Sequence, residues 1–225
     1  MIITIDGPVA TGKSTIAKKL AEAIGYIFFD TGAMYRTLTY GILKHQIDLS
    51  NADSLQQFLN DFNMDIKVIK HQRRYFYEGE DISQKIRSQE ITLAVSKVSA
   101  IKAIRDKLTA IQRELSVGVN AVFEGRDMGT VVFPDAPLKI FLTGRNEIRA
   151  KRRYDQIKAL HPDLTLEQCL EEIIQRDHYD STREHSPLTN AKDAYVLDTS
   201  DLDADEVVYK ILEYKDSLKT KWPHS

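Results

Sequence analysis

The sequence contains a single cysteine, Cys169, among 225 residues. One cysteine cannot form a disulfide framework or a cysteine-rich metal site. Long apolar runs are also missing: the first apolar stretch ends at an acidic residue, and none approaches the roughly 20 residues that a membrane-spanning helix needs. We therefore expect a globular protein of a reducing compartment, the cytoplasm, with no signal peptide and no membrane partner.

An excess of charge of one sign is absent as well. The chain has 31 lysines and arginines against 33 aspartates and glutamates, which gives a formal net charge of −2. Proteins dedicated to nucleic acids or to anionic membrane surfaces usually carry a large basic excess, so we expect neither partner. The 6 histidines show no metal-ligand spacing. With 42% apolar residues, the chain can bury one good-sized core.

Strand and helix patterns alternate along most of the chain. Residues 2–5 and 26–29 are typical of short strands, and each precedes a helical pattern. Gly25 should end the first helix, and Thr31 should cap the start of the second. Strands separated by helices predict a parallel central sheet in a three-layer α/β core. Further predicted elements are helices at 51–62, 90–115 (as a pair), 145–161 and 203–220, strands at 120–129, 138–144 and 194–200, and a capping box at Thr165 and Gln168.

The region of about residues 63–87 interrupts this alternation. Residues 64–70 alternate apolar and polar side chains, residues 73–79 are rich in aromatics, and residues 80–86 follow a turn. These are signals of short antiparallel strands. We predict one domain over 1–225 with this segment as an insert. Its core would comprise about 1–62, 88–144 and 190–225, and a basic lid region about 145–185.

The clearest motif is a glycine-rich loop between the first strand and the first helix. It fits the pattern G-x-x-x-x-G-K-[ST], in which backbone N–H groups hold phosphates, the lysine reaches the β/γ oxygens and the hydroxyl reaches Mg²⁺. A guanine-reading run of the NKxD type is absent, so ATP is favoured over GTP. The predicted nucleotide-binding residues are Gly7, Pro8, Val9, Ala10, Thr11, Gly12, Lys13, Ser14 and Thr15, with Ser14 as the metal ligand.

Such a loop does not say whether water, a protein or a small molecule receives the phosphoryl group. An acceptor that is itself a phosphate needs several guanidiniums to bind its charge and to offset the repulsion between two phosphates. Taken alone, each candidate also fits a solvated or salt-bridged arginine. Four arginines lie at the ends of predicted elements or beside glycine: Arg36, Arg126, Arg176 and Arg183.

Five stretches of sequence carry a family resemblance. They read IDGPVATGKST, FDTGAMYR, IRSQEIT, EGRDMGTVVFPDAPLKIFLT and RDHYDSTREHSPL, in this order from Ile3 to about Ser200. Together they resemble bacterial cytidylate kinases, enzymes that phosphorylate CMP and dCMP. The resemblance implies the P-loop nucleoside-monophosphate-kinase fold, with a small antiparallel insert on the CMP side and a helical lid. It also implies MgATP as phosphoryl donor, CMP or dCMP as acceptor, and a monomer.

The same resemblance implies roles for individual residues. Ser96, Arg105 and Asp127 match the positions that read cytosine, where a carboxylate can accept from the exocyclic amine and an arginine can donate to the ring. Thr31 stands where the family often has serine. Positions 9 and 10 are valine and alanine, where the family often has glycine or small residues. The positions matched to the acceptor phosphate and the sugar are Tyr35, Arg36, Arg126, Arg176, Asp180 and Arg183.

Residues 144–158 are strongly basic and admit two interpretations. They could form a solvated or nucleic-acid-binding face, or a mobile lid that brings an arginine to the transferring phosphate. Arg152 is our leading lid candidate, and Asp30 or Glu124 could hold waters on the metal. The predicted catalytic residues are Lys13, Arg126, Arg152 and Arg176. A kinase for UMP, AMP or shikimate, and a non-catalytic ATP-dependent module, stay open as alternatives.

Overall fold

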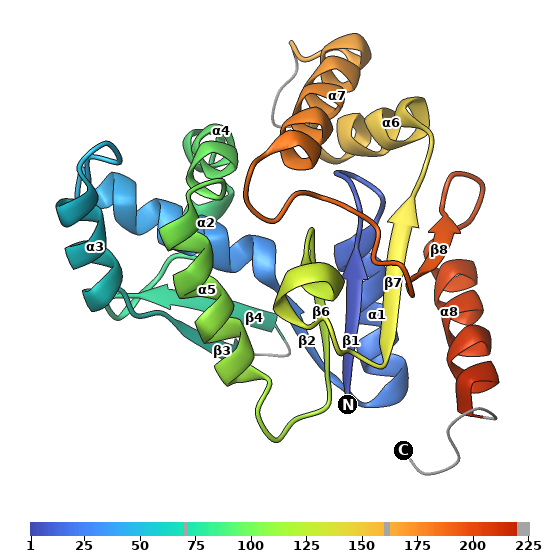
Figure 1. Cartoon of the computed structure of the whole chain (residues 1–225). Helices are drawn as coiled ribbons and strands as arrows, with labels where there is room; N and C mark the ends of the chain where they lie inside the picture. Colours follow the sequence, from blue (N-terminus) through green and yellow to red (C-terminus); the bar gives the residue numbers. More distant parts are fainter. Residues whose placement is uncertain (70–71, 160–162, 220–225) are drawn as a thin grey trace. The chain divides into compact units, whose positions relative to one another are not determined.

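The computed structural model describes residues 1–69, 72–159 and 163–219, which form two compact units (Figure 1). The first unit contains Met1–Phe29 and Leu115–Ser225, and the second contains Asp30–Glu114. None of the helices in the described ranges is both long enough and apolar enough to span a membrane.

A five-stranded sheet forms the centre of the first unit. The order of its strands is β2-β6-β1-β7-β8. β1 pairs in parallel with both β6 and β7, and β7 pairs in parallel with β8. This arrangement confirms the predicted parallel sheet. The strands are β1 (Ile2–Asp6), β2 (Ile27–Asp30), β6 (Ala121–Gly125), β7 (Leu138–Thr143) and β8 (Tyr195–Asp198).

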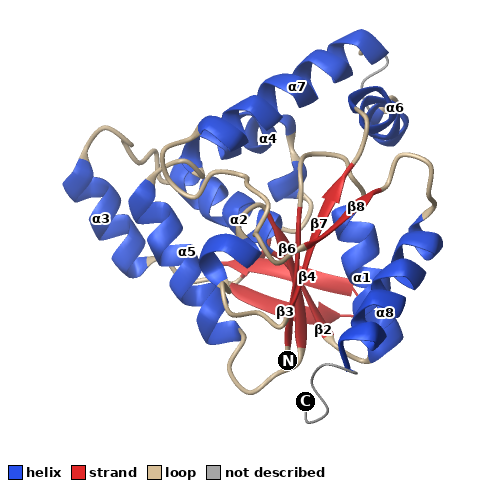
Figure 2. Cartoon of the chain, turned by 45° about the vertical axis from the view of Figure 1, so that its right-hand side comes forward, coloured by secondary structure: helices blue, strands red, loops and turns tan. Residues whose placement is uncertain are grey.

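Two helices, α1 (Lys13–Ile24) and α8 (Ala204–Lys219), cover one face of this sheet (Figure 2). The buried core between them contains isoleucines and leucines of β1, β7, α1 and α8. α1 is bounded by two glycines in the left-handed conformation, Gly12 at φ +88° and Gly25 at φ +69°. A side chain would strain both positions, so the predicted end of this helix at Gly25 is confirmed.

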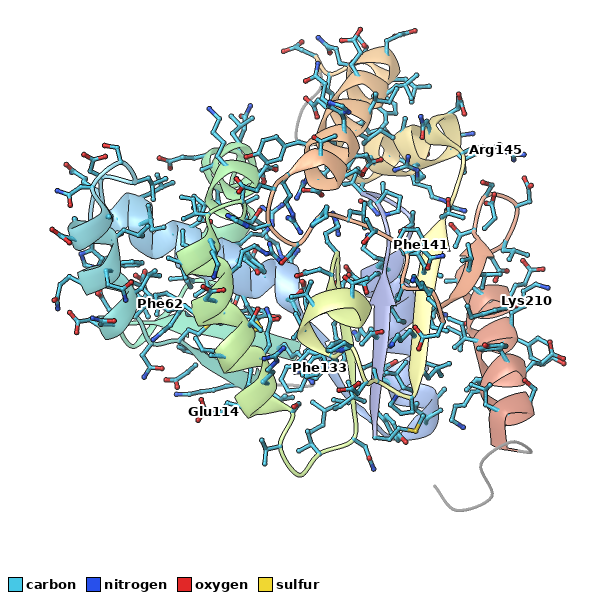
Figure 3. All side chains as sticks on the ribbon, viewed as in Figure 1. Phe62, Glu114, Phe133, Phe141, Arg145 and Lys210 are labelled. Atoms are coloured by element: carbon cyan, nitrogen blue, oxygen red, sulfur yellow. The ribbon has the colours of Figure 1, made fainter. Side chains whose placement is uncertain are left out.

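The other face of the sheet in this unit is covered by a short helical turn, η2 (Met128–Val132). The Asp6 carboxylate holds its start, accepting the N–H groups of Met128 at 2.9 Å and Gly129 at 2.7 Å. After the turn, Phe133 packs on Phe123 of β6 with ring centroids 4.6 Å apart (Figure 3). The end of β1 is thereby tied to the segment that follows β6.

Two further helices, α6 (Asn146–Ile157) and α7 (Leu166–Thr182), lie beyond the carboxyl ends of β1 and β7 (Figures 1 and 2). The capping box at the start of α7 is confirmed: Thr165 accepts the Gln168 N–H, and the Gln168 side chain accepts the Thr165 N–H. The predicted helix at 145–161 is shorter than expected, since α6 ends at Ile157, and the last two predicted residues, 160 and 161, lie outside the described ranges.

The second unit combines helices with a small antiparallel sheet. Strands β3 to β5 pair antiparallel in sequence order, which confirms antiparallel strands within residues 63–87. The predicted pair of helices at 90–115 is also present. The elements are α2 (Thr31–Lys44), α3 (Ala52–Asp61), β3 (Asp65–Ile69), β4 (Gln72–Tyr77), β5 (Glu80–Asp81), η1 (Lys85–Arg87), α4 (Gln89–Val98) and α5 (Lys102–Leu115).

Two local predictions in the second unit are wrong. The N-cap of α2 is Asp30 rather than Thr31, because the Asp30 carboxylate accepts the Ala33 N–H at 2.9 Å while Thr31 is already helical. The expected strand at 80–86 covers only two residues and then becomes the 3₁₀ turn η1. Ile82 and Ile86 are both fully buried and are joined by the bond from the Ile86 N–H to the Ile82 carbonyl. A spacing of four residues places side chains on one face of a helical turn, so burial favours that turn here.

Candidate functional site

The glycine-rich loop lies at the carboxyl edge of the parallel sheet. β1 is in register with β6 and β7 so that Asp6 stands opposite Gly125 and Phe141. The loop, the segment after β6 and the helix after β7 therefore start from the same edge, where parallel α/β sheets bind ligands. Gly7 is required there: a Cβ on it would lie 2.2 Å from the Leu142 carbonyl oxygen, and its φ is +150°.

Hydrogen bonds inside the loop bring its side chains together. Lys13 Nζ donates to the Pro8 carbonyl at 2.5 Å, and Thr11 Oγ1 donates to the same carbonyl at 3.1 Å. Ala10 adopts a left-handed conformation at φ +59°, which is uncommon for a residue with a side chain. α1 begins at Lys13, so the positive end of its dipole points into the loop. The arrangement is suited to binding an anion.

The electrostatics of Lys13 are unusual. Burial and the nearby positive charge of Arg126 lower its pKa to about 7, although Glu124 and Asp177 act in the opposite direction. A lysine that is costly to charge gains strongly from a polyphosphate, because the added negative charge compensates for its desolvation. Lys13 is therefore placed to respond to a phosphate ligand.

Ser14 and Glu124 form a pair of oxygen-bearing side chains at the loop that could serve a divalent cation. The Ser14 hydroxyl donates to Glu124 Oε1, and Glu124 is buried at the end of β6. A hydroxyl and a carboxylate are oxygen ligands of the kind that Mg²⁺ prefers. Asp30, the other acidic residue suggested for metal-bound water, instead caps α2 in the second unit.

A cluster of partly buried guanidiniums surrounds the buried Asp180 in the first unit. Arg126 Nε donates to Asp180 Oδ2 at 2.9 Å, and Arg183 Nη1 lies 3.8 Å from Asp180 Oδ1. Burial alone would raise the pKa of Asp180, but Arg126, Arg176 and Arg183 outweigh it and hold the pKa below its usual range. Three positive charges around one carboxylate leave a net positive site, which suits a second anion.

The remaining predicted residues of the first unit occupy different environments. Asp127 is 2% exposed, and its side chain does not cap the η2 turn that follows. Arg176 lies inside α7, not at the end of an element as the sequence suggested, and its charge acts on both Asp180 and Lys13. Arg183 also donates through Nε to the Ser186 carbonyl at 2.8 Å.

In the second unit, the structure brings Tyr35 and Arg105 together. The Arg105 guanidinium lies 5.1 Å from the centre of the Tyr35 ring and donates to the Ser99 carbonyl at 2.8 Å. Arg105 is only 3% exposed, so it is not an ordinary solvated helix arginine. Arg36 likewise donates to Thr92 Oγ1 at 2.9 Å and to the Ile86 carbonyl at 3.3 Å.

Ser96 and Thr31 are less closely tied to these groups. Ser96 is half-buried on α4, where its carbonyl accepts the Ser99 hydroxyl at 3.0 Å. Thr31 is 2% exposed at the start of α2. Neither position contradicts the predicted role, and both stay predictions.

The helix α6 places its arginines differently from our expectation. Arg152, the leading lid candidate, donates to the hydroxyl of Thr199 at 3.0 Å and to the Thr199 carbonyl. Thr199 in turn donates to the Thr11 carbonyl at 3.2 Å. Arg149 is the buried arginine, and it contacts the loop directly through the Val9 carbonyl at 2.8 Å. The basic sequence pattern does not distinguish the two, but their spacing on a helix shows that they share one face.

By contrast, Arg145 at the start of α6 extends outward (Figure 3) and pairs with Asp201. The basic stretch is thus neither a uniformly solvated face nor a uniformly buried one.

Together, the parallel sheet and the loop with Lys13 and Ser14 define an α/β protein of the P-loop class. Comparison with protein-family models makes the assignment specific: the model described as cytidylate kinase matches residues 3–217. The chain therefore belongs to the cytidylate kinase family, and the family resemblance of the five motifs is confirmed.

Three curated relatives show how much of the chain this similarity covers. A cytidylate kinase of Protochlamydia amoebophila (strain UWE25) is 72% identical over 99% of this chain and 100% of its own length. One from Caldicellulosiruptor bescii is 44% identical over 94% of this chain and 93% of the relative. One from Mycobacterium avium (strain 104) is 46% identical over 92% of each chain.

Proposed function

We propose that this protein is a nucleoside monophosphate kinase that transfers the γ-phosphoryl group of ATP to CMP or dCMP. The products are ADP and CDP or dCDP. Family membership supports this proposal, and one structural observation carries it. The first unit combines a phosphate-binding loop with the cluster of Arg126, Asp180 and Arg183, whose charge is net positive. A protein that only hydrolysed ATP would have less need for the second group.

The chemistry is a direct in-line displacement. An oxygen of the acceptor phosphate forms a bond to the γ-phosphorus while the bond to the β-phosphate oxygen breaks, and ADP leaves with that electron pair. The acceptor is already anionic, so no covalent enzyme intermediate is needed. Catalysis consists of positioning and charge stabilisation. We assign these roles to Lys13, Arg126 and Arg176, and to Arg152 after it releases the carbonyl that it contacts here.

Mg²⁺ is the cofactor that we propose for the donor nucleotide. The Ser14 hydroxyl would be its protein ligand, and Glu124 would accept from its bound water. When bound, the ion neutralises charge on the β- and γ-phosphates. The Ser14 hydroxyl donates its hydrogen to Glu124, which would leave the lone pairs of its oxygen for the cation.

We further propose that Asp127 selects the base. Asp127 is 2% exposed, and a carboxylate can accept a hydrogen bond from the exocyclic amine of cytosine. Uracil presents a carbonyl at this position, so two acceptors would face each other. Ser96 and Arg105 of the second unit carry the same predicted role of reading the base.

The decisive experiment measures ADP release with CMP, dCMP, UMP and AMP as separate acceptors. We expect turnover with CMP and dCMP and little with UMP or AMP. A preference for UMP or AMP would transfer the protein to another acceptor class, and ATP binding without turnover on any acceptor would identify a non-catalytic module.

A variant then tests the base assignment. Asp127→Ala should lower kcat/KM for CMP by about 10- to 100-fold and reduce the preference for CMP over UMP, because the buried acceptor is lost. Its control is Asp135→Ala, an exposed aspartate eight positions further on. If Asp127→Ala kept the full preference for CMP, the assignment of this residue would be wrong. We also propose a cytoplasmic monomer, which sedimentation of the purified protein would test for its oligomeric state.

A further inference from the structure

The peptide groups around Val9 of the phosphate-binding loop are held from outside the loop. The Val9 N–H donates to Asp177 Oδ1 of α7 at 2.9 Å. The Val9 carbonyl accepts from Arg149 Nη1 of α6 at 2.8 Å. Arg149 and Asp177 also pair with each other, with Nη1 and Oδ2 2.5 Å apart. The three groups form a closed ring of contacts, and Figure 1 shows the loop beneath α6 and α7.

Burial makes this ring strong. The side chain of Arg149 is 5% exposed and that of Asp177 is 17% exposed. Arg149 is further fixed by donating through Nε to the Gly144 carbonyl at 2.9 Å. In addition, the Val9 side chain packs against the small apolar cluster of Ala150, Cys169 and Ile173 between the two helices. A charge-assisted hydrogen bond in such surroundings is stronger than one on the surface.

The location of the ring explains what it does for the loop. The next residue, Ala10, is in the left-handed conformation at φ +59°, which residues with a side chain adopt only when their surroundings enforce it. The orientation of the peptides around Val9 determines how the chain enters Ala10. From there to Ser14, the backbone N–H groups are those that the motif uses to hold phosphates. Fixing Val9 on both sides therefore sets the direction of the following amides.

We propose that Asp177, together with Arg149, is a positioning residue for the donor-phosphate loop. It acts through the backbone of Val9 and does not touch the nucleotide. This inference rests on the proposed kinase function, because its readout is the affinity for the phosphoryl donor. It also explains why a valine, which packs against the helices, stands at a position where the loop motif accepts any residue.

The test compares Asp177→Ala with His178→Ala, its neighbour on α7, whose side chain is exposed. We expect Asp177→Ala to raise KM for ATP by about 10- to 100-fold, the range for leaving a buried charged partner unpaired. KM for CMP should stay within about twofold, because the Arg126–Asp180 hydrogen bond uses none of the atoms that hold Val9. His178→Ala should leave both constants unchanged.

Two further variants separate positioning from simple stabilisation. Asp177→Asn preserves the shape and one acceptor oxygen but loses the negative charge, so it should show a smaller rise in KM for ATP than Asp177→Ala. Arg149→Lys retains a positive charge but cannot bond Gly144, Val9 and Asp177 together, and should raise the same constant. Calorimetric titration with MgADP provides a second readout that does not depend on turnover.

The possible results are distinct. A selective loss of ATP and ADP affinity in a folded Asp177→Asn or Asp177→Ala variant supports the inference. Equal rises in KM for ATP and CMP that follow the loss of thermal stability would overturn it, since the ring would then only hold the fold together. Unchanged constants in an active enzyme would also overturn it. Absence of CMP kinase activity in the unmodified protein would instead reject the proposed function.

Discussion

Binding of a nucleotide should cause Lys13 to take up a proton. In the protein by itself, burial and the charge of Arg126 lower the pKa of Lys13 to about 7 from an ordinary 10.5. This difference corresponds to a charging cost on the order of 5 kcal/mol. A diphosphate or triphosphate next to Nζ removes much of that cost, so the pKa in the complex moves back toward its ordinary range.

The sign of the pH dependence follows from this change. Above about pH 7 the complex holds a proton that the unliganded protein lacks, so affinity for the nucleotide must fall as pH rises. At pH 8 about 90% of unliganded Lys13 is neutral, and roughly 0.9 proton should be taken up per nucleotide bound. Between pH 7.5 and 8.5 the affinity should decrease by about eightfold. At pH 6 uptake should be close to zero.

Calorimetric titration with MgADP in buffers of different ionisation enthalpy directly measures the number of protons taken up per nucleotide bound. ADP avoids the complication of turnover, and its phosphates are already ionised at pH 8. The matched control is Lys13→Arg, because a guanidinium stays charged at every pH used and cannot take up a proton. Tight binding at pH 8 with an uptake near zero would refute the reasoning. Uptake that persists in Lys13→Arg would assign the proton to another group.

Two further predictions concern the frame of the loop. Burial raises the pKa of Asp6 to about 6, although the N–H groups of Gly129 and Met128 act in the opposite direction. The stability that Asp6 contributes to the fold is therefore complete below about pH 4 and is lost as the pH rises through 6. The stability of wild type relative to Asp6→Asn should therefore fall by up to roughly 3 kcal/mol between pH 4 and pH 7 in urea unfolding, and a constant difference would contradict this. Gly7→Ala should destabilise the protein by about 2 kcal/mol or more and abolish MgADP binding, because its Cβ meets the Leu142 carbonyl oxygen at 2.2 Å. Unchanged unfolding and binding would show that β7 can move aside.

Local patterns predicted much of the secondary structure, because those patterns are themselves the cause of the elements. Gly12 and Gly25 bound α1 since only glycine adopts the left-handed conformation without strain. The Thr165 and Gln168 side chains form their capping box within four residues of chain. The two errors in the second unit have a different origin. Asp30 competes with Thr31 for the same cap, and burial of Ile82 and Ile86 replaces strand by turn.

Some residues of the candidate site could be identified from the sequence, and others could not. The loop was identifiable from sequence because its residues are contiguous, and the segment of Arg126 and Asp127 because it belongs to a distinctive motif. The role of Arg149 was missed, since basic residues recur along α6 and nothing in the sequence marks which one is buried. Asp177 was missed as well, because its partner Val9 lies 168 positions away.

The sequence by itself determined the phosphate chemistry. A glycine, a lysine and a hydroxyl at fixed spacing can bind phosphate wherever a strand and a helix flank them. Only the tertiary structure decided which side chains hold that loop through hydrogen bonds and how far the pKa of Lys13 is lowered. The reason is physical. Hydrogen bonds within a few residues depend on local backbone geometry, whereas burial and electrostatic fields depend on groups that the chain brings together from distant positions.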